Sequence, residues 1–209
     1  MKKIGRLHVI TDTALQSRFS HLELARMAIA GGADTIQFRQ KEGSTRNLIE
    51  IAQQLKQICT GMGVTFIVND RLDVAIASDS DGVHLGQDDF PIDLARDLLG
   101  DQKIIGGSAV TLEKAQKCLV DGADYVGFGP VYPTTSKADA GPVTGIDLMI
   151  KVIETVPLPL IAIGGVTKDN TLEVMEAGAH GIAVISAVCC QESPEQATQE
   201  LSQALKGGM

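Results

Sequence analysis

The chain has 209 residues, of which 44% are hydrophobic, no tryptophan, and a formal net charge of −8. A general surface for nucleic acid or for an anionic membrane needs clustered excess Lys and Arg, so this charge excludes both as partners. No apolar run is long enough to span a membrane, and the four cysteines show no metal-ligand or disulfide spacing. We therefore expect a cytoplasmic protein with reduced thiols and small-molecule partners, and leave open whether it forms a homo-oligomer.

Short β-branched runs alternate with longer amphipathic runs along the chain. The predicted strands cover residues 7–11, 34–38, 65–69, 82–85, 104–108, 124–128, 159–164 and 181–185. The predicted helices cover residues 20–30, 44–62, 71–77, 91–99, 111–120, 146–154, 168–176 and 194–206. Eight such βα units predict one α/β domain over residues 1–209, a (β/α)₈ TIM barrel. The alternative is an open doubly wound sheet, which usually has fewer strands and a glycine fingerprint.

Glycines and hydroxyl groups follow the last three predicted strands. In a barrel, the loops after the strands carry the chemistry, and those after the last two often bind phosphate. Gly164-Gly165 and Ile185-Ser186 stand at these two places, although the glycines could simply turn the chain into the next helix. The loop Gly127–Lys137 adds backbone N–H groups, hydroxyls and a lysine, which suit an anion; an ordinary turn-rich loop is the alternative.

Two carboxylates follow neighbouring predicted strands. Asp70 comes after the third strand and Asp89 after the fourth, with no His or Cys beside either. Hard oxygen donors of this kind suit a Mg²⁺ ion that borrows further ligands from a phosphate and water. Asp70 could equally cap the following helix, so the pair, rather than either residue alone, indicates the metal site.

Cations are placed at the same predicted rim. If the second strand continued through residue 41, alternation would put Gln37, Arg39 and Lys41 on one face. An amide, a fork-shaped guanidinium and an ammonium together suit a diphosphate group, whereas a solvated charged loop end is the simpler interpretation. Beside Asp70 and Asp89, they indicate a site for a Mg²⁺-diphosphate.

Five motifs follow one another along the chain: Gln37–Lys41, Val68–Asp70, His84–Asp89, Gly127–Lys137 and Ile163–Val166. Together they resemble the motifs of the thiamine-phosphate synthase family. The resemblance implies a TIM barrel that joins 4-amino-5-hydroxymethyl-2-methylpyrimidine diphosphate to 4-methyl-5-(2-phosphooxyethyl)thiazole or its carboxylated form. The expected reaction is dissociative: diphosphate leaves with the assistance of Mg²⁺, and the thiazole nitrogen traps the resulting pyrimidine cation.

The resemblance also implies roles for individual residues. The residues expected to hold the pyrimidine diphosphate are Gln37, Arg39, Lys41 and Asn69. Mg²⁺ is assigned to Asp70 and Asp89, and the departing diphosphate to Ser108 and Lys137, which with Arg39 form the expected catalytic set. The residues expected to hold the thiazole phosphate are Thr134, Ser136, Gly165, Ile185 and Ser186.

The chain departs from the family pattern at three positions. Gln40 stands where Glu is usual, Ser136 where Thr is usual, and Val110 where His commonly follows the Ser108 position by two residues. The sister family of thiazole tautomerases is implied to use that His as an acid or base, and valine cannot transfer a proton. A non-catalytic, ligand-binding barrel remains the other alternative. We expect His84, inside an apolar strand, to be packed and hydrogen-bonded.

Overall fold

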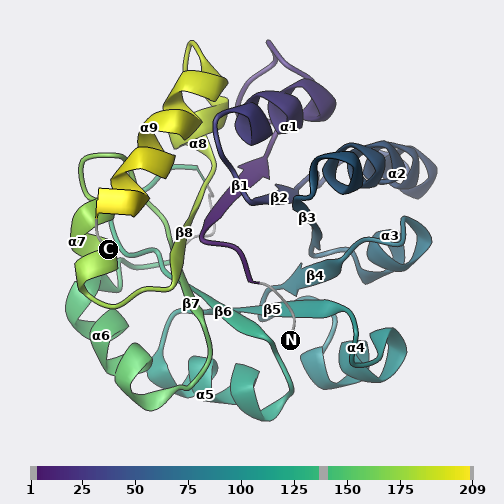
Figure 1. Ribbon diagram of the computed structural model, residues 1–209. Helices are drawn as coiled ribbons and strands as arrows, with labels where there is room; N and C mark the ends of the chain where they lie inside the picture. Colours follow the sequence, from purple (N-terminus) through teal and green to yellow (C-terminus); the bar gives the residue numbers. More distant parts are fainter. Residues whose placement is uncertain (1–3, 137–140, 208–209) are drawn as a thin grey trace.

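The computed structural model describes residues 4–136 and 141–207, and these form a closed barrel of eight parallel strands surrounded by helices (Figure 1). The strands are β1 (Leu7–Thr11), β2 (Thr35–Phe38), β3 (Thr65–Asn69), β4 (Gly82–Leu85), β5 (Ile104–Ala109), β6 (Tyr125–Phe128), β7 (Leu160–Ile163) and β8 (Gly181–Val184). They follow one another in chain order, and β8 pairs with β1. The predicted TIM barrel is therefore confirmed, and the open-sheet alternative is wrong.

The helices follow the strands around the outside of the barrel. They are α1 (His21–Ala30), α2 (Thr45–Met62), α3 (Leu72–Ala77), α4 (Ile92–Leu99), α5 (Leu112–Val120), α6 (Gly145–Thr155), α7 (Thr171–Glu176), α8 (Ser186–Cys189) and α9 (Pro194–Gly207). The short helix α8 was not predicted, because a single turn is too short to show helical periodicity. None of the helices in residues 4–136 and 141–207 is both long and apolar enough to cross a membrane.

Strand alternation produces two apolar regions. One face of each strand points outward, and residues such as Val9, Ile36 and Phe66 pack there against the helices. The other face fills the barrel with a smaller cluster that contains Ile67 and Tyr125. Because inward-facing side chains fill the barrel, the ligand site of such a fold lies at the carboxyl ends of the strands.

Side-chain caps mark the start of several helices. The side chains of Ser20, Ser44 and Thr111 each accept a hydrogen bond from a backbone N–H in the first turn of α1, α2 and α5. The seventh helix was predicted from residue 168, but α7 begins only at Thr171. The Asn170 side chain instead accepts from the Thr167 N–H at 2.8 Å and donates to the carbonyl of Gly165 at 3.0 Å. It thereby fixes the loop after β7.

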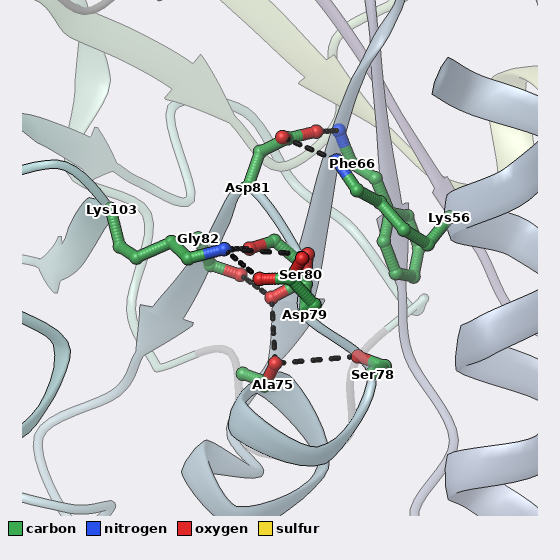
Figure 2. A network of polar contacts seen from close by, with 9 residues as sticks. All are labelled: Lys56, Phe66, Ala75, Ser78, Asp79, Ser80, Asp81, Gly82 and Lys103. Carbon is green, nitrogen blue, oxygen red and sulfur yellow. Dashed lines mark hydrogen bonds and ion pairs between the residues drawn. The ribbon is translucent and has the colours of Figure 1, made fainter. Parts of the chain in front are cut away.

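Carboxylates close the amino-terminal end of the barrel. Asp34, Asp81 and Asp124 stand directly before β2, β4 and β6, and each accepts a hydrogen bond from a backbone N–H of the preceding strand region. Figure 2 shows one of these sites, where Asp81 binds the N–H of Phe66 at 2.9 Å and the ammonium of Lys56 at 2.5 Å. These contacts explain why the sequence repeats an acidic residue at the helix-to-strand joints.

Candidate functional site

A cavity of about 940 Å³ opens at the carboxyl ends of the strands. Its volume is at the upper end of the range typical of small-molecule sites. Most of the predicted site residues line it: Gln37, Arg39, Asn69, Asp70, Ser108, Thr134, Ser136, Gly165, Ile185 and Ser186. Of the other predicted residues, Lys41 and Asp89 are not among the described lining residues, and Lys137 lies outside the part of the chain that the structure describes.

Arg39 is held at the cavity wall by a buried carboxylate. Its backbone N–H extends the pairing of β2 with β1 by donating to the carbonyl of Thr11. Its guanidinium donates to Asp12, which is only 2% exposed and also accepts from the N–H of Ala14 at 2.8 Å. Asp12 therefore orients Arg39. The sequence did not identify Asp12 as the partner of Arg39, because the pairing joins residues 27 positions apart.

The residues at the end of β2 and just after it do not all line the cavity. Gln37 and Arg39 line the cavity, as alternation predicted, but β2 ends at Phe38 and Lys41 is exposed outside the described lining. The prediction that all three share a face is therefore wrong for Lys41. Gln40 is not among the described lining residues, and its side-chain oxygen lies 3.1 Å from Nε2 of His21. A glutamine at this position thus contacts a buried imidazole rather than the ligand space.

His21 lies behind this part of the wall. Its Nδ1 is 2.8 Å from the hydroxyl of Thr11, and its ring packs edge-on against Phe38 with the centroids 4.8 Å apart. Burial lowers the pKa of His21 to about 4, against the opposing effect of the Gln40 hydrogen bond. The imidazole is therefore neutral near pH 7 and supports the strand ends that carry Arg39 and Asp12.

The acidic side of the cavity is formed after β3 and β4. Asn69, Asp70 and Asp88 line it, and Asp70 has a left-handed backbone with φ of 64° whose N–H donates to the His84 carbonyl at 2.8 Å. The N-cap position of α3 is occupied by Arg71, whose side chain makes no capping hydrogen bond. Asp70 therefore does not stand at the N-cap position of this helix.

Asp89 is set back from the cavity. One of its carboxylate oxygens accepts from the N–H of Gly86 at 2.7 Å, which closes the turn after β4. Within the described residues no group of three or more His, Cys, Asp or Glu side chains could hold a metal ion. A metal here would therefore take few protein ligands, all hard oxygens, and would complete its coordination from ligand and water, as Mg²⁺ commonly does.

The opposite side of the cavity is rich in hydroxyls and glycine. The hydroxyls of Ser136 and Ser186 are 2.7 Å apart, and the Ser136 N–H donates to the Thr134 hydroxyl at 3.2 Å. Gly165 has φ of 67°, and a Cβ there would lie 2.5 Å from the carbonyl oxygen of Pro133. Glycine is therefore required at this turn, and it also leaves the loop after β6 close against the loop after β7.

The floor of the cavity contains a polar row that the sequence identified only in part. The imidazole of His84 contacts the hydroxyls of Tyr125 and Ser108, so the predicted hydrogen-bonded histidine is confirmed. Val110 lines the wall two residues beyond Ser108. Lys114, in the first turn of α5, adds a cation that no strand-end rule would have found.

Comparisons with known proteins agree on one family. Residues 7–188 match the family described as thiamine monophosphate synthase. A thiamine-phosphate synthase of Salinibacter ruber is 53% identical over 99% of this chain and 91% of its own length. A thiamine-phosphate synthase of Methanocella arvoryzae is 52% identical over 93% of this chain and 92% of its own length. The solved thiamine phosphate pyrophosphorylase from Pyrococcus furiosus is 43% identical, with a TM-score of 0.90 over 98% of this chain and 96% of that one.

Proposed function

The chain belongs to the thiamine monophosphate synthase family, and from this membership we infer that the cavity joins a pyrimidine diphosphate to a thiazole phosphate. The proposed substrates are 4-amino-5-hydroxymethyl-2-methylpyrimidine diphosphate and 4-methyl-5-(2-phosphooxyethyl)thiazole or its carboxylated form. One observation carries the proposal beyond membership. The cavity has a cationic and acidic side and, opposite it, a hydroxyl- and glycine-rich side. This division supports separate sites for two phosphorylated substrates.

The pyrimidine diphosphate is assigned to the side formed after β2, β3 and β5. Arg39 presents a planar set of N–H donors that suits a diphosphate, and its contact with Asp12 limits the directions in which the guanidinium can point. Gln37, Asn69 and Ser108 add neutral donors along the same wall. We assign Lys41 and Lys137 to the diphosphate from the family motifs alone, since one lies outside the described lining and the other outside the described residues.

The thiazole phosphate is assigned to the opposite side. Ser136 and Ser186 each carry a hydroxyl that can donate to a phosphate oxygen, and their separation of 2.7 Å lets one group contact both. Thr134, Gly165 and Ile185 complete the proposed site, where glycine allows close approach to backbone N–H groups. The usual Thr of the family is replaced by Ser136 without loss of the hydroxyl.

The acidic residues fit Mg²⁺. Asp70 lines the cavity, and Asp89 closes the turn beside it, so both would offer hard oxygen ligands near the proposed diphosphate. When bound, Mg²⁺ supplies charge neutralisation to the diphosphate leaving group. The small number of protein carboxylates supports an ion that is held jointly by protein and substrate.

The proposed chemistry needs no protein nucleophile. Diphosphate departs first, and the amino group of the pyrimidine stabilises the cation that remains. The nitrogen of the thiazole then attacks this cation to form thiamine phosphate. The protein has to hold the two substrates in line and to stabilise the charge that develops on the leaving group, which are the roles of Arg39, Ser108 and Lys137 in this proposal.

The tautomerase alternative is not favoured. It would require an acid or base two residues beyond Ser108, and Val110 stands in the cavity wall at that position. A non-catalytic barrel is separated from the synthase by a direct assay. Purified protein is mixed with both substrates and Mg²⁺, with and without chelator, and thiamine phosphate and diphosphate are measured. Metal-dependent formation of both products supports the synthase, whereas binding of both substrates without product refutes it.

The metal assignment has its own test. Asp70→Asn should lower turnover at least tenfold, on the scale of losing one charged ligand near the reacting groups. The matched control is Asp73→Asn, which removes an exposed carboxylate that pairs with Arg71. The control should keep near-normal turnover. If Asp70→Asn also does so at limiting Mg²⁺, Asp70 does not hold the metal.

A further inference from the structure

We propose that Tyr125 and His84 are positioning residues that turn the hydroxyl hydrogen of Ser108 into the cavity. The inference deepens the proposed function, because it concerns how Ser108 meets the diphosphate. Tyr125 lies at the start of β6, His84 within β4 and Ser108 near the end of β5, and all three side chains line the cavity. Neither Tyr125 nor His84 belongs to the set of residues assigned to the substrates above.

The three side chains form a continuous hydrogen-bonded row. The Tyr125 hydroxyl is 3.0 Å from Nδ1 of His84, and Nε2 of His84 is 2.9 Å from the hydroxyl oxygen of Ser108. Tyr125 is only 1% exposed, whereas Ser108 is only partly buried. The row therefore runs along the floor of the cavity from a fully buried phenol to a partly exposed hydroxyl.

The buried end of the row determines where its hydrogens lie. Burial raises the pKa of Tyr125, so the phenol keeps its hydrogen. Among the described residues, the hydrogen-bond partner of that hydroxyl is His84. If Nδ1 of His84 carried a hydrogen, the buried phenol would be left with no acceptor for its own among residues 4–136 and 141–207, which is costly. The phenol therefore donates to Nδ1, and the imidazole carries its hydrogen on Nε2.

The orientation of Ser108 follows from that of the imidazole. The Nε2–H group donates to the serine oxygen, so the serine hydrogen cannot point back toward His84. It is turned toward the cavity, where it can donate to an anionic oxygen. In the opposite tautomer Nε2 would accept from Ser108, and the serine would present only lone pairs to the diphosphate, which repel it.

Two glycines make room for this row. A Cβ at Gly106 would lie 2.2 Å from the ring of Tyr125 and 2.5 Å from Nδ1 of His84. A Cβ at Gly127 would lie 2.8 Å from the imidazole ring of His84. Both glycines therefore leave space that the ring of His84 occupies, so that β5 and β6 hold its ring plane in place.

The tautomer can be observed without any assay of activity. A long-range ¹H–¹⁵N spectrum of the ligand-free protein near pH 7 should show His84 protonated at Nε2 only, with its signals assigned by their loss in His84→Gln. In Tyr125→Phe the Nδ1 atom loses its donor, and the spectrum should shift toward a mixture of tautomers. An Nδ1–H form in the unaltered protein would overturn the inference even if the protein makes thiamine phosphate.

Binding provides the functional readout. We expect Tyr125→Phe to weaken binding of inorganic diphosphate about tenfold, the effect of losing one well-oriented hydrogen bond to a charged group. Binding of the thiazole phosphate should not change and serves as the internal control. The double variant Tyr125→Phe with Ser108→Ala should bind diphosphate only slightly more weakly than Tyr125→Phe alone, because the serine hydroxyl is already misoriented. Full additivity of the two losses would refute the link.

The identity of the donor gives a second comparison. His84→Gln keeps an N–H group near the position of Nε2 and should retain most of the diphosphate affinity, whereas His84→Leu should not. Tyr132→Phe removes the other tyrosine hydroxyl, which contacts Glu173 at 2.7 Å, and should leave binding of diphosphate unchanged. Equal losses in His84→Gln and His84→Leu would assign His84 a packing role only and overturn the proposal.

Discussion

Acid should destabilise the protein through His21. The pKa of this imidazole is lowered from 6.5 to about 4, first because it is buried, so the folded state holds it neutral. The unfolded chain binds a proton with a pKa of about 6.5. Between these two values the unfolded state carries more protons, and the free energy of unfolding must therefore fall as the pH falls. The stabilisation is fully present above pH 6.5 and is lost as the pH approaches 4.

The size of this effect follows from the same two values. One pKa unit corresponds to about 1.4 kcal/mol, so between pH 7 and pH 4.5 the neutral imidazole of His21 accounts for a loss of roughly 2.5 kcal/mol. That is a large part of the 5 to 15 kcal/mol by which proteins are usually stable. His8 shifts in the same direction, because it is buried inside the barrel, and adds to the loss.

Urea denaturation at pH 7 and at pH 4.5 measures the effect, and His21→Asn isolates it. Asparagine can keep the contact that Nδ1 makes with Thr11 but cannot be protonated. Its stability should fall less between the two pH values than that of the unaltered protein, by roughly 2.5 kcal/mol. Gln40→Glu should shift the NMR titration midpoint of His21 upward, because a carboxylate would face Nε2. An unchanged pH difference in His21→Asn would refute the reasoning.

Three further changes are predicted. Asp124→Ala should lower the free energy of unfolding by about 2 to 3 kcal/mol, because it leaves the buried N–H of Ile105 unpaired. Asp124→Asn should lower the free energy of unfolding, measured by urea denaturation, by only about 1 kcal/mol. Equal losses in the two variants would contradict this reasoning. Ser136→Ala should raise the KM for the thiazole phosphate about tenfold. Ser186→Ala should raise this KM by a smaller factor in the Ser136→Ala variant than in the unaltered protein, since the two hydroxyls are in contact. Gly165→Ala should lower the Tm and weaken thiazole phosphate binding, because φ is positive and Pro133 blocks a Cβ; an unchanged Tm would argue against the packing.

The barrel could be predicted from the sequence because its signals are local. Apolar periodicity repeats along the chain, and counting eight βα units was enough to choose closure over an open sheet. The cavity residues followed from a single rule, that chemistry lies where parallel strands end. That rule placed Arg39, Asp70 and Ser108 at one cavity without any knowledge of their distances.

The finer arrangement could not be predicted, because it depends on contacts between distant segments. Asp12 meets Arg39, and Gln40 meets His21, only after β1 and β2 have paired. Lys41 was misplaced because β2 ends three residues earlier than the assumed alternation requires. Nothing in the sequence distinguishes these outcomes in advance, since the same residue types serve equally well in a solvated loop.

Aspartate finds different hydrogen-bond partners at the two ends of the barrel. At the amino-terminal end of parallel strands unpaired N–H groups point outward, and a carboxylate placed there, such as Asp34 or Asp124, satisfies its acceptor oxygens on the chain itself. At the carboxyl end the strands expose carbonyl oxygens, which cannot donate. A carboxylate there must find its donors in a turn, as Asp89 does, or in a cation, as Asp12 does with Arg39. Acidic residues at this rim therefore depend on loops, cations and ligands for their hydrogen-bond donors. For this physical reason, an Asp after a barrel strand is a stronger indication of function than an Asp before one.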